Sequence, residues 1–142
     1  MHRIIDWNEL WKAIYVSSPE RIEKGRDPAT VWDRRAAPYR RATRGEKRAT
    51  EQEIAVLNLR PDDTVLDVGA GTGRLAVPIA RTAAHVTALD PSEGMLAVLR
   101  EQMVAAGRTN YSAVTMRWED AVIGRDIEPH DVVIAAFSLG FY

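Results

Sequence analysis

A carboxylate and three glycines stand close together at residues 67–73, which read Asp-Val-Gly-Ala-Gly-Thr-Gly. An apolar run at 64–66 precedes them, and a helical pattern begins directly after them at Arg74. A strand, a glycine turn and a helix in this order bring backbone close to a nucleotide-like ligand at the carboxyl end of the strand. Glycine suits such a turn because it adopts positive φ and puts no Cβ between the backbone and the ligand.

The spacing and the charge of this loop argue against a phosphate site. The dinucleotide fingerprint G-x-G-x-x-G needs its third glycine at position 74, where this chain has arginine. A pyrophosphate prefers bare N–H groups with no anion nearby, so Asp67 would repel it. The same carboxylate suits a ligand that carries a positive charge, such as an amino group. A NAD- or nucleotide-dependent oxidoreductase is therefore kept as an alternative only.

The segment 67–73 resembles the D-x-G-x-G-x-G signature of class I S-adenosylmethionine-dependent methyltransferases. The downstream spacing supports this resemblance. A second β-type run at 85–89 ends in Asp90, which lies 17 positions after Gly73, and residues 90–96 resemble the D-x-S-x-x-M-L run of the family. The resemblance covers residues 30–142, and the three features together, in this order, are specific.

The resemblance implies which residues bind S-adenosylmethionine. Asp67 would face the methionine ammonium, and Asp90 would hold the two ribose hydroxyls, because one carboxylate can accept both O–H donors. As alternatives, Asp67 could be a helix-capping or strand-end acid, and Asp90 could be a helix N-cap. The loop would wrap the methionine and sulfonium end with Gly69, Ala70, Gly71, Thr72 and Gly73. The adenine would be bordered by Pro91, Ser92 and Met95.

Beyond the third strand, the family often has a short acidic tract that binds the adenine amino group. Here Arg117 stands where the first acid often stands, so Glu119 and Asp120 are the alternatives for that contact. The backbone N–H of Trp118 would donate to the ring, and its indole either stacks on the adenine or belongs to the core.

Two further segments complete the implied site. Ala136 and Phe137 follow the fourth expected strand, where the methyl group and the acceptor meet in the family. An N-P-P-Y-type tetrapeptide is absent there, which disfavours the members that methylate amides. Residues 32–39 resemble the W-x-x-x-A-x-x-Y segment of many small-molecule methyltransferases, in which Tyr39 would cover the cofactor. A tyrosine that packs between helices is the alternative.

The elements that must position these residues alternate between strand and helix, the pattern of a parallel sheet. We predict an α/β, Rossmann-like parallel sheet flanked by helices. The strands are expected at 64–68, 85–89, 111–116 and 130–136, and the helices at 6–16, 29–43, 46–59, 73–82 and 92–106. Residues 1–60 would form an N-terminal helical extension, and residues 61–142 the first half of the cofactor-binding core.

The expected sheet is incomplete. Members of the class have seven strands in the order 3-2-1-4-5-7-6, whereas the sequence supplies four and ends at Tyr142. An apolar strand with one open edge is an aggregation hazard. We therefore expect a chain truncated after the fourth strand, or a partner or second copy that covers this edge.

Composition narrows the remaining possibilities. The 142 residues suffice for one domain. No apolar stretch is long enough to span a membrane and no secretory leader is evident, so we expect a cytoplasmic protein without a membrane partner. The absence of cysteine excludes disulfides and thiolate chemistry. The three histidines lie far apart in the sequence, so no metal site is expected.

The charge is unevenly distributed. Residues 21–50 carry ten Lys or Arg and four acids, whereas residues 61–142 carry six Arg and eleven acids. A basic block can bind nucleic acid, but no RNA-binding pattern accompanies this one, and a solvated helical face is the favoured interpretation. We therefore expect a small-molecule acceptor. A nucleic-acid acceptor and a non-catalytic module that binds S-adenosylmethionine are the alternatives.

Overall fold

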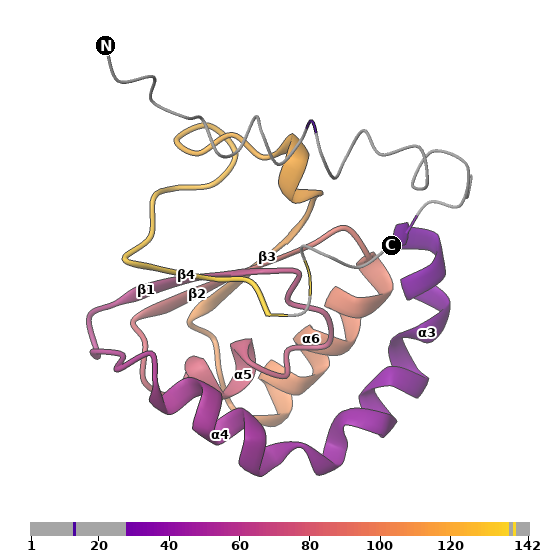
Figure 1. The fold of residues 1–142 in the computed structure, drawn as a ribbon, viewed down its shortest axis with the longest axis horizontal. Coiled ribbons are helices and arrows are strands. Elements are labelled where there is room, and N and C mark those ends of the chain that lie inside the picture. Colours follow the sequence, from indigo (N-terminus) through magenta and orange to yellow (C-terminus); the bar gives the residue numbers. More distant parts are fainter. Residues whose placement is uncertain (1–12, 14–27, 137, 139–142) are drawn as a thin grey trace.

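The computed structural model describes residue 13, residues 28–136 and residue 138 (Figure 1). The helix expected at 6–16 and the site residue Phe137 lie outside the described residues. The described chain forms an α/β structure around one sheet, with α5 and α6 below the sheet in Figure 1 and the segment 116–131 above it.

Four parallel strands form the sheet, in the order β3-β2-β1-β4. Their bounds are Thr64–Val68 for β1, His85–Asp90 for β2, Tyr111–Thr115 for β3 and Val132–Ile134 for β4. This confirms the expected fold class, although β4 is shorter than the expected strand at 130–136. Asp67 pairs with Ala88 and Val68 with Leu89, so the carboxyl ends of β1 and β2 lie side by side.

The helices that precede β1 in the sequence agree with the sequence-based expectation only in part. Helix α3 spans Pro28–Ala42, the 3₁₀ turn η2 spans Thr43–Gly45, and α4 spans Lys47–Ala55. The helix expected at 46–59 therefore ends early. Asn58 takes a φ of 47°, which a continuing helix does not allow. Leu57 and Leu59 then pack against the core as the chain enters β1.

The helices that connect the strands differ in length. Helix α6 spans Glu93–Ala105, close to the expected 92–106, and Gly107 ends it with a φ of 64°. Helix α5 spans only Ala76–Ile79, whereas 73–82 was expected. Its shortening has two causes in the sequence. Gly73 has a φ of 88°, which delays the helix start, and Pro78 lacks the N–H that would bond to the preceding turn.

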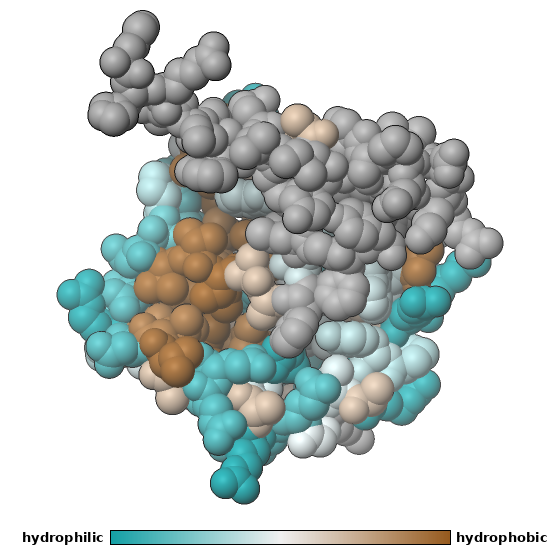
Figure 2. All heavy atoms as spheres, viewed as in Figure 1, coloured by the Kyte–Doolittle hydropathy of each residue, from teal (hydrophilic) through white to brown (hydrophobic). Residues whose placement is uncertain are grey.

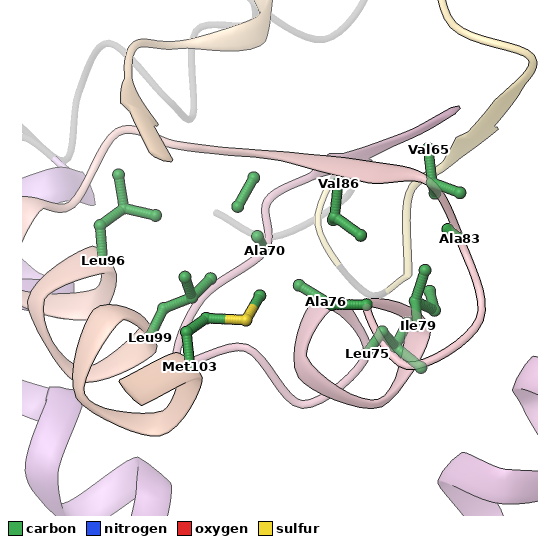
Figure 3. Packing of buried hydrophobic residues seen from close by; sticks show 12 residues of the cluster. Val65, Ala70, Leu75, Ala76, Ile79, Ala83, Val86, Leu96, Leu99 and Met103 are labelled. Carbon is green, nitrogen blue, oxygen red and sulfur yellow. The ribbon is translucent and has the colours of Figure 1, made fainter. Parts of the chain in front are cut away.

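The larger core lies between the sheet and helices α5 and α6. Figure 3 shows Leu96, Leu99 and Met103 of α6 directed toward Val86 of β2 and toward α5. A smaller cluster on the opposite face contains Leu66, Val68, Leu89 and Ile127. Because side chains alternate along a strand, Asp67 points to the same face as Val65, toward the start of α5.

The outer edge of β4 exposes apolar surface. Among the described strands β4 pairs only with β1, and Val133 is 56 % exposed. Figure 2 shows apolar surface gathered over β1 and β4 in the same view as Figure 1. Within the described residues, no helix has the length and apolar character that crossing a bilayer requires. No group of potential metal ligands is found in this part of the chain either.

Candidate functional site

A cavity of about 270 Å³ opens at the carboxyl ends of the strands. The loop after β1, the end of β2, helix α3 and the segment after β3 contribute to its walls. The cavity brings together most of the residues that the sequence singled out. These are Tyr39, Asp67, Gly69, Ala70, Gly71, Thr72, Asp90, Pro91, Met95, Trp118, Glu119 and Ala136.

Three candidate residues are not part of the cavity wall, and each has another structural role. A Cβ on Gly73 would meet Val77 at 2.9 Å and Leu99 at 3.0 Å, so this glycine allows the loop to pack on the core. Ser92 is fully buried as the N-cap of α6, where its hydroxyl accepts a hydrogen bond from the Met95 N–H at 3.1 Å. Asp120 is exposed to solvent at the end of the 3₁₀ turn η3, Trp118–Asp120.

The glycine loop is held against the end of β2 by backbone hydrogen bonds. The N–H groups of Gly69 and Ala70 both donate to the Leu89 carbonyl, at 2.7 and 3.0 Å. Gly71 has a φ of 55°, and a Cβ added to it would meet no protein atom within 4 Å. The Cα of Gly71 therefore faces open space in the cavity, where it leaves room for a ligand.

Asp67 is a buried carboxylate at the floor of the cavity. It is 2 % exposed, and its Oδ2 has no hydrogen-bond partner in the described structure. Burial raises the pKa of Asp67 to about 7, and the negative charge of Asp90 adds to this rise. The charge of Arg74 and a hydrogen bond from the Ala76 N–H act in the opposite direction. An unpaired oxygen at such a place suits a cationic donor, which would replace the lost hydration.

Asp90 connects the loop to the start of α6. Its Oδ2 accepts a hydrogen bond from the Gly71 N–H at 2.9 Å, and its Oδ1 accepts one from the Ser92 N–H at 2.8 Å. Burial raises its pKa, while these two N–H groups lower it. Because Ser92 is the N-cap of α6, the alternative that Asp90 is a mere N-cap is wrong. Each oxygen has a second lone pair that can accept a hydroxyl.

Helix α3 contributes an aromatic wall that includes a residue the sequence analysis did not assign. Trp32 and Tyr39 both line the cavity, and their rings meet edge to face with centroids 5.6 Å apart. The Arg35 guanidinium lies 5.9 Å from the centre of the Trp32 ring. Tyr39 therefore borders the cavity and packs against a residue of its own helix, and its expected role in covering the cofactor stays a prediction. The seven-residue spacing of the two aromatics, two helical turns, was the available signal for Trp32.

The segment after β3 forms another part of the wall. Trp118 lines the cavity and also packs against the smaller core cluster, so both interpretations of its indole are compatible with its position. Glu119 lies in the wall with its side chain 13 % exposed, and it pairs with Arg117 at 3.8 Å. Arg117, which replaces the acid common in the family, is itself in the wall.

Arg74 is a second cavity residue that the sequence did not assign to the site. Its Nη1 donates to Glu53 Oε2 at 2.8 Å and to Thr50 Oγ1 at 3.0 Å, which ties α4 to the end of the glycine loop. The sequence analysis noted Arg74 only because it occupies the position of the third glycine in the dinucleotide fingerprint. Nothing in the local pattern showed that Glu53 and Thr50 would come to lie beside it.

The comparisons with known proteins agree with this architecture. Residues 65–142, more than half of the chain, match a family model described as a methyltransferase domain. An uncharacterized protein of Haemophilus influenzae is 33 % identical over 112 residues, which are 78 % of this chain and 41 % of that protein. Ribosomal RNA small subunit methyltransferase A of Thermotoga neapolitana is 30 % identical over 90 residues, 63 % of this chain and 33 % of that enzyme.

Solved structures show the same fold. Magnesium protoporphyrin IX methyltransferase from Synechocystis, solved with bound S-adenosylhomocysteine, has a TM-score of 0.53 and 26 % identity, with 64 % of this chain and 42 % of that chain covered. The DhpI–S-adenosylhomocysteine complex has a TM-score of 0.59 at 22 % identity, covering 75 % of this chain and 50 % of that chain. The fold is that of class I methyltransferases with a Rossmann-like core.

The chain belongs to the methyltransferase-domain family, whose class I members use S-adenosylmethionine as cofactor. It spans less than half the length of the curated relatives reported above. The assignment favours the methyltransferase interpretation over the dinucleotide-dependent oxidoreductase.

Proposed function

We propose that the protein transfers a methyl group from S-adenosylmethionine to a small-molecule acceptor. The observation that supports S-adenosylmethionine as the ligand is the unpaired, buried Oδ2 of Asp67 in a cavity that also contains Asp90. Two carboxylates beside a bare glycine loop suit a ligand with a cationic group and hydroxyls. They disfavour a ligand that presents phosphate at this place.

The cavity geometry supports a role for each residue. Asp67 would pair with the ammonium of the methionine moiety, with the buried Thr72 hydroxyl, which lacks a partner in the described structure, nearby. Asp90 would accept the two ribose hydroxyls on its remaining lone pairs. Pro91 and Met95 would border the adenine. For the adenine amino group we favour Glu119 over Asp120, because Glu119 lies in the cavity wall and Asp120 does not.

S-adenosylmethionine supplies a methyl group on a positively charged sulfur, which is already a strong electrophile. The part left to the protein is binding, orientation and electrostatics. The glycine loop and Asp90 would hold the nucleoside, while Asp67 would fix the amino-acid end. Methyl transfer is an in-line displacement, so the alignment that these contacts impose is the main source of rate enhancement. The aromatic wall of α3 would restrict water at the cavity.

Calorimetry separates the proposal from its alternatives. The protein should bind S-adenosylhomocysteine and should not bind NAD under the same conditions. Binding of NAD alone would overturn the proposal. Incubation with radiolabelled S-adenosylmethionine and fractionated cell extract then tests transfer. Labelling of a low-molecular-weight fraction supports a small acceptor. Cofactor binding without any labelled product would favour the non-catalytic module.

Substitution of Asp90 provides a residue-level test. Asp90→Ala should weaken S-adenosylhomocysteine binding by about 1–3 kcal/mol, or about 5- to 150-fold in Kd, because hydrogen bonds to a charged acceptor are lost. Asp131→Ala is the matched control. Asp131 also accepts a backbone N–H, that of Thr64 at 2.8 Å, but outside the cavity wall. Equal affinity in Asp90→Ala and the parent protein would contradict the assigned role.

A nucleic-acid acceptor is the second candidate, and the charges of α3 and α4 favour it. Arg34, Arg41 and Arg48 are exposed on these two helices. Two acids of the same helices, Asp33 and Glu53, instead bond to residues of the core domain. Asp33 bonds to Ser92, and Glu53 pairs with Arg74. Several relatives are named ribosomal RNA methyltransferases. Exposed arginines at this spacing can bind phosphates without base specificity.

The triple variant Arg34→Glu, Arg41→Glu, Arg48→Glu distinguishes the two acceptors. For a small acceptor, we expect methyl transfer to the low-molecular-weight fraction to stay within about twofold of the parent, because surface substitutions away from the cavity have small effects. Fluorescence anisotropy with ribosomal RNA fragments provides the second measurement. Salt-dependent RNA binding by the parent that the triple variant loses, together with labelled RNA, would establish the nucleic-acid acceptor instead.

A further inference from the structure

Helix α3 is joined to the start of α6 through one carboxylate. Asp33 Oδ1 accepts a hydrogen bond from the Ser92 hydroxyl at 2.6 Å and another from the Gly94 N–H at 2.9 Å. The two partners are the N-cap and a first-turn residue of α6, about sixty residues further along the chain. Asp33 is not part of the cavity wall, so it has no direct contact to offer a ligand there.

The hydrogen bonds continue from Ser92 into the cavity. The Ser92 N–H donates to Asp90 Oδ1, and the other oxygen of Asp90 accepts from the Gly71 N–H. Asp33, Ser92, Asp90 and Gly71 therefore form one continuous series of contacts. It connects α3 with the end of β2 and with the glycine loop, and its last two members line the cavity.

The backbones of α3 and α6 also approach each other closely at this point. A Cβ added to Gly94 would lie 2.9 Å from the Cα of Asp33 and 3.0 Å from its carbonyl oxygen. Contacts this short with backbone atoms require the helices to separate. Trp32, the residue before Asp33, lines the cavity and carries Tyr39 against its ring. The position of the aromatic wall therefore depends on how closely α3 meets α6.

We propose that Asp33 is a positioning residue of the cofactor cavity, which fixes the distance between the aromatic wall of α3 and the Asp90 carboxylate. The inference rests on the proposed function, in that the ligand is S-adenosylmethionine. Asp33 acts through Ser92 and Gly94, and does not touch the ligand. When its contacts are lost, α3 is free to shift from the start of α6. Trp32 and Asp90 then no longer face the ligand at a fixed separation.

Three variants test this role by calorimetry with S-adenosylhomocysteine. Asp33→Ala removes the acceptor and should raise the Kd by about tenfold. Asp33→Asn keeps a carbonyl oxygen that can accept both hydrogen bonds, so it should bind within about twofold of the parent. Gln102→Ala is the matched control, because Gln102 accepts a hydrogen bond from Arg40 of α3 elsewhere on the same helix pair. Its removal should leave the Kd unchanged.

Gly94→Ala tests the same geometry without removing a polar group. Alanine has a higher helix propensity than glycine, so α6 itself should not be weakened by the change. Its Cβ should displace α3, which should raise the Kd several-fold and lower the melting temperature, because the two helices are forced apart. An unchanged Kd in Gly94→Ala would contradict the positioning role, since the separation of α3 from α6 would then not affect ligand binding.

The outcomes separate this inference from the proposed function. If the parent protein fails to bind S-adenosylhomocysteine, the proposed function falls. If the parent binds and Asp33→Ala binds equally well, the positioning role of Asp33 is wrong while the proposed function stands. If Asp33→Asn is as weak as Asp33→Ala, or if Gln102→Ala weakens binding equally, the specific contact with Ser92 and Gly94 is not the cause, and the inference is overturned.

Discussion

Replacement of Gly71 by valine should abolish the binding of S-adenosylhomocysteine while the protein still folds. A Cβ at this position meets no protein atom within 4 Å, so the protein itself offers no clash. Valine would instead fill the part of the cavity that we assign to the ligand. The positive φ of 55° adds a backbone cost of about 1–2 kcal/mol for any L-residue. We expect the Kd to rise by at least about a hundredfold.

Gly107→Val is a closely matched control for this experiment. Gly107 has a φ of 64°, and a Cβ there also meets nothing within 4 Å, but the residue follows α6 and does not line the cavity. Both variants thus bear a similar backbone cost. Calorimetry should find the parent Kd in Gly107→Val and no measurable binding in Gly71→Val. Retained binding by Gly71→Val would mean that the glycine loop does not touch the ligand.

The affinity for S-adenosylhomocysteine should rise with pH as Asp67 ionises. Burial holds the pKa of Asp67 at about 7 in the protein, and a cationic ligand favours the ionised form. Binding of the ammonium group therefore releases a proton in the range below this pKa. Calorimetry between pH 5.5 and 7 should show an increase in affinity that approaches about tenfold per pH unit, with a plateau above.

Asp67→Asn should bind weakly and lose this pH dependence, because asparagine cannot ionise. Asp63→Asn is the control, since Asp63 is a second buried aspartate, 5 % exposed, that lies outside the cavity wall. It should keep the pH dependence of the parent. A pH-independent affinity in the parent, or the same profile in Asp67→Asn, would show that Asp67 does not receive the cationic group.

The raised pKa of Asp67 also makes the stability of the ligand-free protein depend on pH. An unfolded aspartate has a pKa of about 3.9, so between about 4 and about 7 the folded protein binds more protons than the unfolded chain. The contribution of Asp67 to the free energy of unfolding is therefore fully present below about 4 and is lost as the pH rises through about 7. Urea unfolding of the parent and Asp67→Asn measures this contribution by difference.

Much of the fold could be predicted from local sequence patterns. The strands β1 and β2 are short apolar runs with a carboxylate at the last or the next-to-last residue, and both were located within one residue at each end. The family resemblance assigned Asp67 and Asp90 to one cofactor site, and the carboxyl ends of their neighbouring parallel strands do meet at one edge of the sheet. Helix lengths were harder to predict. Gly73 and Pro78 shorten α5, although its apolar pattern extends further in both directions.

The cavity wall outside the loop could not be derived from the same patterns. Trp32 and Arg74 enter it because α3 and α4 dock against α6 and the glycine loop, and these contacts join residues that are distant in sequence. Ser92, by contrast, was expected at the ligand but does not line the cavity. Its position close to Asp90 suggested a ligand contact, but its hydroxyl caps the N-terminus of α6. Local spacing fixes which residues share a strand end, and it does not determine how a helix docks on them.

The two neighbouring carboxylates of the cavity, Asp67 and Asp90, have a consequence for how the protein resists proteolysis. In the absence of ligand, burial and the nearby charge of Asp90 both make the ionised form of Asp67 unfavourable, as its raised pKa reflects. A cationic ligand that pairs with Asp67 would offset this cost and would add its binding energy to the folded state alone. Resistance to proteolysis would then rise with the cofactor concentration, so that the polypeptide is cleaved most slowly when methyl donor is abundant.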